Sequence, residues 1–301
     1  MMSNKEWFNP ASWEKAWRED AHTAVNRMKR AGMDPAHVMD QRAKAFNEQA
    51  FSDEGRRRAK RIMSWLEHQG VVFKDASILD IGAASGGFTV PFAKEGAKVT
   101  AVETSLPLIE LMKKNISSLT SGAVEIVAEP FEQIDLQAKG WEKAYDLVFV
   151  SMCPVLVDWE SVERVLSVAR KYCYMSLSVG PHENSIIDEV WPLVSDQPRG
   201  SEHLEMAYLI NLLLLKGYAY QSLITREITT KTVSRAKALD EAMTKLSLFG
   251  VSCDERVRNI VSDYLEKAYP SDEVSIRQGG RFGKVLVQLE RQHMYSSDEQ
   301  I

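Results

Sequence analysis

The stretch from residue 77 to residue 105 constrains the fold of this 301-residue chain more than any other part of the sequence. Its apolar run at 78–81 is too short for a helix and leads into Gly82, which indicates a buried strand followed by a tight loop. The apolar positions within 88–93 then predict a helix, and residues 98–102 predict a second strand. This order of strand, loop, helix and strand is typical of α/β folds that bind a nucleoside.

The chemistry of this stretch separates two kinds of nucleoside cofactor. A carboxylate at Glu103, about twenty residues after the loop, can accept hydrogen bonds from ribose hydroxyls. The loop itself, residues 82–87, reads Gly-Ala-Ala-Ser-Gly-Gly and lacks the G-x-G-x-x-G spacing of dinucleotide sites. Asp80 precedes the first glycine, where an anion repels a pyrophosphate but can hold an ammonium group. The spacing therefore argues against a nicotinamide dehydrogenase.

The pattern Asp80-x-Gly82-x-x-x-Gly86 resembles motif I of the class I methyltransferases that use S-adenosylmethionine (SAM), written D-x-G-x-G-x-G. Ala84 replaces the middle glycine, and an alanine there predicts an ordinary backbone conformation. The resemblance implies SAM as the cofactor and an orienting role for Asp80 at its methionine end. The other positions that it implies for cofactor binding are Gly82, Ala83 and Gly86 in the loop, and Glu103 and Thr104 at the ribose.

Further apolar runs predict five more strands, and the resemblance implies how the seven are arranged. The expected fold is α/β, a doubly wound, mostly parallel seven-stranded sheet with an antiparallel last strand, plus helical N-terminal and cap insertions. Residues 1–70 are predicted to form a helical N-terminal extension or lid. Residues 71–290 are predicted to form the SAM-binding domain, with helical insertions at 181–217 and 232–270. Residues 291–301 are expected to be a frayed tail.

Residues after the third and fourth strands are expected to border the cofactor and the acceptor. Phe131 follows the third strand, where its ring is predicted either to stack on adenine or to pack in the core, and Glu132 can accept from the adenine amino group. The fourth strand ends in Ser151-Met152-Cys153-Pro154. That sequence differs from the N/D-P-P-Y/F of methyltransferases acting on adenine or glutamine nitrogen, so such substrates are disfavoured. Ser151 is expected at the cofactor, and Met152 and Cys153 at the acceptor.

Four aromatic or basic residues are further candidates for the acceptor side. His182, in a predicted loop at 180–184 after the fifth strand, is the candidate general base because imidazole titrates near neutrality. Trp191 begins a predicted helix in the following insertion and is expected to contact the acceptor. Trp7 and Trp13 lie in the N-terminal extension, and they are predicted either to dock that extension or to form a lid over the acceptor.

The charge pattern gives no strong nucleic-acid signal. Net charge is −5, so the chain as a whole does not attract a polyanion. The basic residues Arg56, Arg57, Arg58, Lys60 and Arg61 are interspersed with carboxylates, which indicates a solvated helix face. The three cysteines are too scattered for a zinc pattern, so no metal is expected. No signal peptide or apolar run of about 20 residues is present, which favours a cytoplasmic protein without a membrane segment.

These observations predict a SAM-dependent methyltransferase that acts on a small-molecule acceptor by in-line displacement. Three alternatives remain open. The first is an RNA or protein methyltransferase that uses the basic N-terminal helix. The second is a nicotinamide dehydrogenase, against which the loop spacing argues, and the third is a SAM-binding protein without catalytic activity. The sequence predicts neither the acceptor atom nor the oligomeric state.

Overall fold

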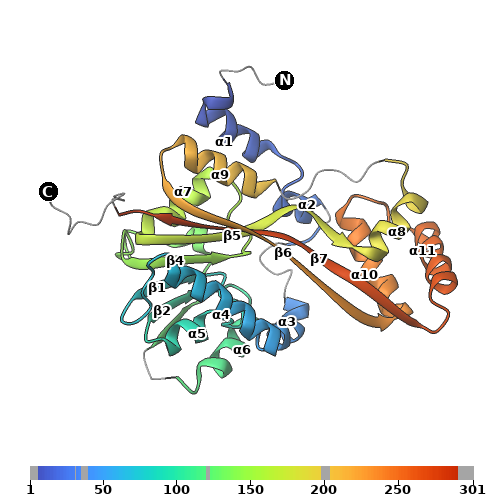
Figure 1. Ribbon diagram of the computed structural model, residues 1–301, viewed down its shortest axis with the longest axis horizontal. Coiled ribbons are helices and arrows are strands. Elements are labelled where there is room, and N and C mark those ends of the chain that lie inside the picture. The colour runs from blue at the N-terminus through green and yellow to red at the C-terminus, as the bar shows by residue number, and fades with distance from the viewer. Residues whose placement is uncertain (1–5, 31, 35–39, 120–122, 198–203, 291–301) are drawn as a thin grey trace.

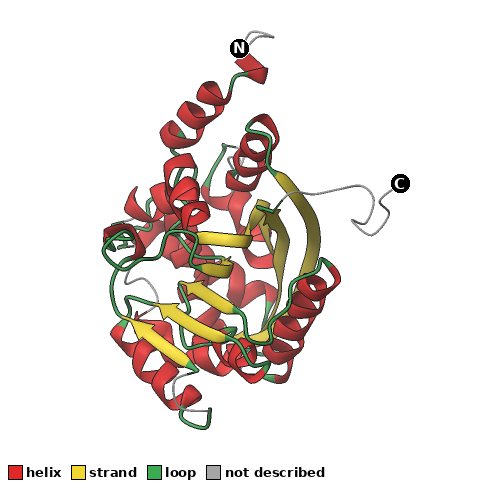
Figure 2. Ribbon diagram, turned by 90° about the vertical axis from the view of Figure 1, so that its left-hand side faces the viewer, coloured by secondary structure: helices red, strands yellow, loops and turns green. Residues whose placement is uncertain are grey.

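The computed structural model describes residues 6–30, 32–34, 40–119, 123–197 and 204–290, so the predicted tail 291–301 lies outside the described residues. Within them, one sheet carries helices on both of its faces (Figures 1 and 2). The strands are β1 Ser77–Ile81, β2 Lys98–Val102, β3 Val124–Val127, β4 Tyr145–Ser151, β5 Ala169–Asn184, β6 Ala219–Ser234 and β7 Glu273–Gln288. The helices are α1 Pro10–Glu19, α2 Ala24–Arg30, α3 Ala43–Ala50, α4 Asp53–His68, α5 Thr89–Lys94, α6 Leu106–Ile116, α7 Trp159–Val168, α8 Ser185–Val194, α9 Glu205–Leu215, α10 Arg235–Leu248 and α11 Glu255–Ala268. Short 3-10 turns are η1 Glu6–Phe8, η2 Asp40–Arg42 and η3 Phe131–Gln133.

The strand order of the described sheet is β3-β2-β1-β4-β5-β7-β6. Strands β1 to β5 pair in parallel, whereas β7 is antiparallel to both of its neighbours, β5 and β6. The predicted doubly wound, mostly parallel seven-stranded sheet with an antiparallel last strand is therefore confirmed. The chain moves outward from β1 to β3 and then returns to place β4 on the other side of β1. Ligands of such sheets bind at this switch point, beyond the carboxyl ends of β1 and β4.

Strand side chains alternate between two apolar layers, as the period of a pleated strand requires. On one face, which we name the α4 face, α4 and α5 pack with Leu66 and Phe92 against Ile78 and Phe149. On the opposite face, α7 and α9 cover a second cluster that includes Val148 and other residues of β1, β4, β5 and β7. A central sheet buried on both sides explains why the β4 sequence is almost continuously apolar.

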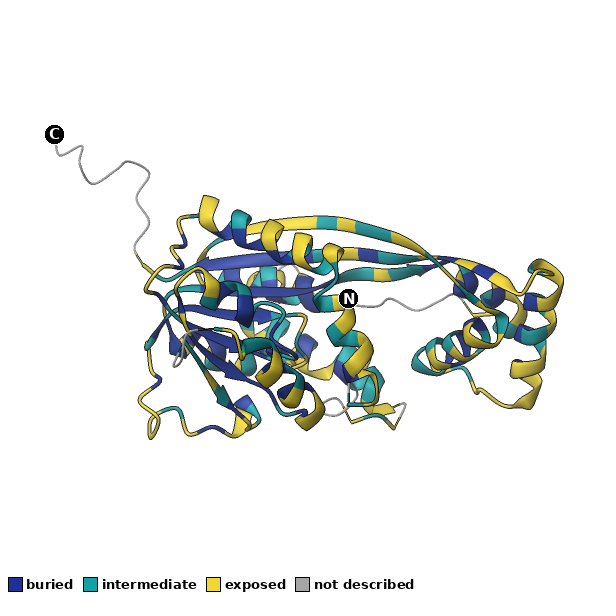
Figure 3. Ribbon diagram, turned by 90° about the horizontal axis from the view of Figure 1, so that it is seen from below, coloured by how far each residue is buried: buried dark blue, intermediate teal, exposed yellow. Residues whose placement is uncertain are grey.

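Strands β5, β6 and β7 run beyond the rest of the sheet and carry α8, α10 and α11 at their far end (Figures 1 and 3). We name these helices, with the strand ends beneath them, the arm. The arm has a hydrophobic cluster of its own, in which Val274 and Ile276 of β7 are buried against Ile187 and Leu246. The last two strands of the sheet, β6 and β7, are therefore shared between the central sheet and the arm.

The predicted loop at 180–184 is wrong, because these residues continue β5 to Asn184. Pairing with β7 shifts register between Val179 and Glu183, which marks a β-bulge. Gly180 has φ of 67° and precedes Pro181, which has no backbone N–H to donate. A bulge is one of the few places in a sheet that accept this pair of residues, so the Gly-Pro sequence bends β5 without ending it.

Candidate functional site

The glycine-rich loop joins the carboxyl ends of β1, β2 and β4. The backbone N–H groups of Gly82 and Ala83 donate to the carbonyl oxygen of Val102 at 2.9 and 3.1 Å. Gly82 and Gly86 have φ of 72° and 89°, a left-handed conformation that glycine adopts without strain. A Cβ at Gly82 would also collide with Sγ of Cys153 at the end of β4. Only glycine therefore fits where β1 and β4 approach each other.

Ala84 also adopts a left-handed conformation, with φ of 49°. The prediction of an ordinary backbone conformation at this alanine is therefore wrong. A left-handed conformation costs a residue with a Cβ roughly 1–2 kcal/mol. One hydrogen bond offsets part of that strain, because the Ala84 N–H donates to Oε2 of Glu103 at 2.8 Å.

Glu103 fastens the loop to the start of α6. Its Oε1 accepts from the N–H groups of Thr104 and Ser105, each at 2.8 Å, while Oε2 accepts from Ala84. The carboxylate is only 9% exposed. A carboxylate accepts about four hydrogen bonds, so Glu103 retains capacity for a ribose hydroxyl beside the three amides. The ribose contacts of Glu103 and Thr104 stay predictions.

Asp80 is buried at the end of β1 and accepts a hydrogen bond of 2.6 Å from Oγ1 of Thr89. Burial, with a smaller contribution from the negative charge of Glu103, raises the pKa of Asp80 to about 7. The hydrogen bond from Thr89 acts in the opposite direction and lowers this pKa. Asp80 therefore ties β1 to α5. Thr89 was missed by the sequence reasoning because a threonine at a helix start carries no distinguishing pattern.

The end of β4 lies beside the glycine loop. The predicted contacts of Ser151 with the cofactor, and of Met152 and Cys153 with the acceptor, stay predictions. Oγ of Ser151 lies 3.2 Å from Oγ of Ser176 on β5. The Met152 side chain is exposed, and its φ of 54° turns the chain sharply after the strand. Burial raises the pKa of Cys153 to about 12, so its thiolate is not available near neutral pH. Cys153 is therefore better explained as a small side chain that lines the site than as a nucleophile.

Phe131 packs in the core and does not offer its ring to a ligand. It is 3% exposed within the hydrophobic cluster that α7 and α9 cover. The Arg164 guanidinium lies 5.3 Å from its ring centre. The packing interpretation is therefore favoured over adenine stacking. Glu132 is exposed in η3, and its contact with adenine stays a prediction.

The early tryptophans dock the N-terminal extension onto α9. Trp17 is fully buried and stacks on Tyr208 with ring centres 5.9 Å apart. Trp13 meets Tyr208 edge-on at 6.2 Å, and its Nε1–H donates to the carbonyl oxygen of Trp7 at 3.0 Å. These contacts favour docking over a lid for Trp7 and Trp13. Figure 1 shows α1 lying along α9, on the side of the sheet opposite α4.

The expected place of Trp191 at the acceptor is corrected by the structure. Its ring packs edge-on against Phe249 at 5.6 Å, within the hydrophobic cluster of the arm. Its Nε1–H donates to the carbonyl oxygen of Gln197 at 2.8 Å. Trp191 therefore holds the arm together, on the helix that follows the extension of β5 past the end of β4.

His182 lies in β5 just after the bulge and is half-buried. Its Nε2 is 3.0 Å from Oγ of Ser178, and its ring centre is 6.1 Å from that of Phe282 on β7. The contact with Ser178 places the imidazole beside the row of serines on the α4 face. Its catalytic role stays a prediction.

Helix α3, and not the tryptophan helix, is the part of the N-terminal extension that lies against the glycine loop. Nδ2 of Asn115, on α6, donates at 2.8 Å both to Oδ1 of Asn47 and to the carbonyl oxygen of Ser85. A Cβ at Gly87 would lie 3.3 Å from Cβ of Ala50, so the loop and α3 are in van der Waals contact. No local pattern marks these residues, because the contact joins positions 68 apart in the sequence.

The described residues of this site fit the chemistry of a nucleoside with a charged tail. Glu103 supplies an acceptor for ribose, and Asp80 supplies a second carboxylate behind the loop. Oγ of Ser85, in the loop itself, is buried without a hydrogen-bond partner among the described residues. A doubly wound sheet with this loop and carboxylate at its switch point defines a Rossmann-like protein that binds a nucleoside cofactor.

The sequence of the same region resembles a known family. Residues 78–173, from β1 into β5, match a family model described as a methyltransferase domain. Over these residues the match supports the predicted resemblance to the class I methyltransferases that use SAM. No curated protein matches the chain.

Several solved structures resemble the chain at low sequence identity. A putative methyltransferase from Bacillus halodurans is 14% identical with a TM-score of 0.48, over 76% of this chain and 98% of that one. Magnesium protoporphyrin IX methyltransferase from Synechocystis, solved with bound SAM, is 14% identical with a TM-score of 0.41, over 72% and 90%. Phosphoethanolamine N-methyltransferase 2 from Haemonchus contortus is 16% identical with a TM-score of 0.46, over 88% and 60%.

Two kinds of feature are absent from the described residues, membrane-spanning helices and clusters of metal ligands. These residues contain no helix that is both long and apolar enough to cross a membrane. They also contain no group of three or more His, Cys, Asp or Glu side chains arranged to hold a metal ion.

Proposed function

We propose that the chain is a SAM-dependent methyltransferase and that it acts on a small-molecule acceptor bound on the α4 face, beside the end of β4. The observation that carries the proposal is a row of polar side chains that the sheet buries there. Ser176 and Ser178 on β5 are 3% and 6% exposed, and Ser151 on β4 lies next to Ser176. Groups buried beneath α4 are accessible to a small molecule more readily than to a folded macromolecule.

The described residues divide the work of an in-line displacement. Bound SAM supplies a methyl group that is already activated on a sulfonium. Glu103 and the glycine loop position the nucleoside, and the end of β4 holds the acceptor against the donor. Holding two reactants in line supplies much of the barrier reduction by itself. Where the acceptor atom must lose a proton, His182 is the candidate base, and the contact between its Nε2 and Oγ of Ser178 orients the imidazole ring.

The charge pairing of α4 supports a small acceptor over RNA. Arg56 pairs with Asp53 at 2.5 Å, while Arg57 and Arg61 pair with Glu54 at 3.2 and 3.0 Å. These exposed pairs neutralise much of the basic cluster. Cations that bind a phosphate backbone displace the counterions of the nucleic acid, and a cation already paired with a carboxylate does so less readily. A macromolecular substrate is therefore the second candidate.

The test is methyl transfer from SAM labelled on its methyl group to a cell extract separated into small-molecule, RNA and protein fractions. We expect label in the small-molecule fraction, and a Glu103→Gln variant should transfer much less. Label that follows RNA or protein would contradict the proposal. An absence of label in every fraction, with SAM still bound, would favour the alternative of a protein without catalytic activity.

A further inference from the structure

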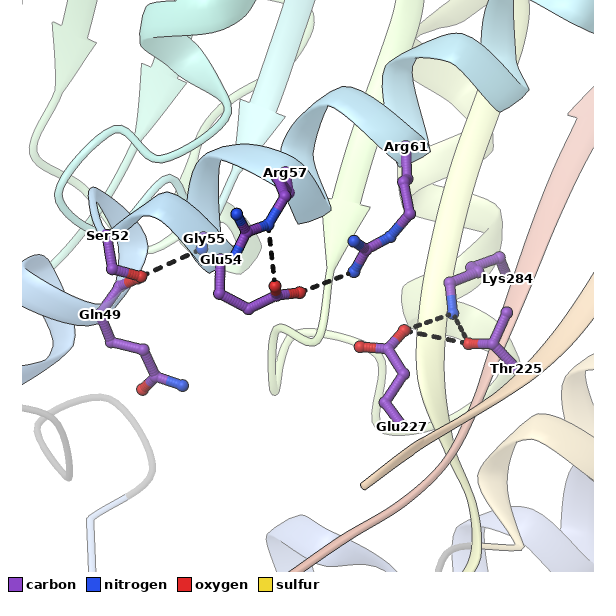
Figure 4. Close-up of polar contacts among 9 residues, drawn as sticks. All are labelled: Gln49, Ser52, Glu54, Gly55, Arg57, Arg61, Thr225, Glu227 and Lys284. Atoms are coloured by element: carbon purple, nitrogen blue, oxygen red, sulfur yellow. Dashed lines mark hydrogen bonds and ion pairs between the residues drawn. The ribbon is translucent and has the colours of Figure 1, made fainter. Parts of the chain in front are cut away.

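Lys284, near the middle of β7, is a buried cation that the steps above do not use. The residue is 6% exposed and lies on the α4 face. Its Nζ donates to Oγ1 of Thr225 at 2.5 Å and to the carbonyl oxygen of Phe282 at 3.3 Å. The nearest carboxylate oxygen is Oε1 of Glu227, at 3.7 Å. Figure 4 shows this group on β6 and β7, and it shows Arg57 and Arg61 of the neighbouring α4 directed toward Glu54.

Positive charge exceeds negative charge around Lys284. Arg58 and Arg61 project from α4 close enough to lower the pKa of Lys284, which burial already lowers, while Glu227 raises it. Arg61 is paired with Glu54. Arg58 is half-buried, and no hydrogen bond or ion pair of its guanidinium occurs among the described residues. Three cations therefore share this region with one carboxylate at ion-pair distance from Lys284.

A structural role explains this arrangement poorly. Burying an ammonium is costly unless it is well paired, and a buried ion pair is often replaced by apolar residues without loss of stability. The 3.7 Å separation from Glu227 is longer than a charge-assisted hydrogen bond, and neighbouring guanidinium groups oppose the charge further. An anion bound between Lys284 and the α4 arginines would remove that repulsion.

The position of Lys284 suits a molecule that also reaches the methyl donor. Ser176 on β5 pairs in register with Ser151 on one side and with Lys284 on the other. Adjacent strands lie about 4.8 Å apart, so Lys284 is about 10 Å from Ser151 across the sheet. One small molecule can therefore span from the end of β4 to Lys284.

We propose that Lys284 and Arg58 form a subsite for an anionic group, a carboxylate or a phosphate, on the methyl acceptor, with the paired Arg61 adding positive charge nearby. The acceptor is then a small organic acid or phosphate ester, methylated at an atom several bonds from its anionic end. This inference rests on the proposed function for the identity of the acceptor, but the anion site can be tested without methyl transfer.

The first experiment measures binding of inorganic phosphate and of acetate to the full chain by calorimetry at low ionic strength. We expect one of the two anions to bind, and the one that does identifies the chemical class of the acceptor. Lys284→Met and Arg58→Gln should each weaken that binding at least tenfold. Glu227→Gln should strengthen it, because a competing carboxylate is removed. The matched control is Arg56→Gln, since Arg56 is on the same helix but pairs with Asp53.

Two results would overturn the proposal. One is that neither anion binds, and the other is that binding is the same in Lys284→Met as in Arg56→Gln. Thermal unfolding separates function from structure, because Lys284→Met should melt at the same temperature as wild type or higher. A melting temperature well below that of wild type would assign Lys284 a structural role and also overturn the proposal.

The second experiment passes the labelled product of the extract assay over an anion-exchange resin. We expect the resin to retain the product, and Lys284→Met to form much less of it at matched extract concentration. A labelled small molecule that passes the resin unretained would refute the anionic acceptor. If no labelled product forms while phosphate still binds through Lys284, the proposed function fails and the anion site stands.

Discussion

Replacing Glu103 with glutamine tests the centre of the cofactor site, because it keeps the size of the side chain and removes its charge. In the structure, the two carboxylate oxygens accept from three backbone N–H groups, each at 2.8 Å. An amide has one oxygen, so whichever way it turns, its NH2 group faces at least one of these donors. The loop then loses one charge-assisted hydrogen bond, worth about 1.5–3 kcal/mol.

The same change weakens the binding of the cofactor, because a ribose hydroxyl then meets a neutral amide in place of a carboxylate. A loss of about 1.4–2.8 kcal/mol in binding corresponds to a tenfold to hundredfold weaker dissociation constant. Calorimetric titration with S-adenosylhomocysteine measures this loss directly, and the melting temperature of the free protein reports the loop separately. Glu132→Gln, an exposed carboxylate after β3, is the control and should bind as wild type does. An affinity of Glu103→Gln within twofold of wild type would refute the assignment of Glu103 to the ribose.

Two further predictions concern residues of the same loop. Ala84→Gly should raise the free energy of unfolding by about 0.5–1 kcal/mol, because relief of the left-handed strain, roughly 1–2 kcal/mol, outweighs the entropic cost of a glycine. Chemical denaturation measures this change, and a less stable variant would show that Ala84 is not strained. The second prediction concerns pH. The folded-state pKa of Asp80 is raised from 3.8 to about 7, so the folded protein binds this proton more tightly than the unfolded chain does. The contribution of Asp80 to the free energy of unfolding should therefore fall as pH rises from about 4 to about 7, and Asp80→Asn should remove that fall.

The control for the pH prediction is the difference in unfolding free energy between wild type and Asp80→Asn at pH 5 and at pH 8. We expect the variant to gain on wild type at the higher pH, since only the wild type must then bury an ionised carboxylate. Equal differences at the two pH values would show that the carboxyl of Asp80 titrates normally.

Local sequence was sufficient for the central half of the fold. The predicted bounds of β2, residues 98–102, agree with the structure, because this strand is a short apolar run between polar or turn residues. The strand order and the antiparallel β7 followed from the resemblance at the glycine loop. Asp80 and Glu103 were found because their spacing from the glycines is a property of the sequence itself.

The same local reasoning failed where backbone conformation depends on distant partners. Gly180-Pro181 is a turn signal in isolation, yet pairing with β7 turns it into a bulge inside a longer strand. Ala84 is held in a left-handed conformation by the hydrogen bond that its N–H donates to Glu103, 19 positions away. In both cases tertiary contacts decided between conformations that the sequence alone ranks the other way.

The sequence by itself therefore determined the type of fold and the end of the sheet at which a cofactor is expected. Only the tertiary structure decided which side chains lie around the end of β4. In the structure, Trp191 lies in the arm and Trp17 docks the N-terminal extension onto α9. Lys284 lies beside Ser176 and near the arginines of α4. The physical reason is that hydrophobic periodicity is a property of residues close together in the sequence. The register of β7 between β5 and β6 depends instead on contacts between residues far apart in the chain.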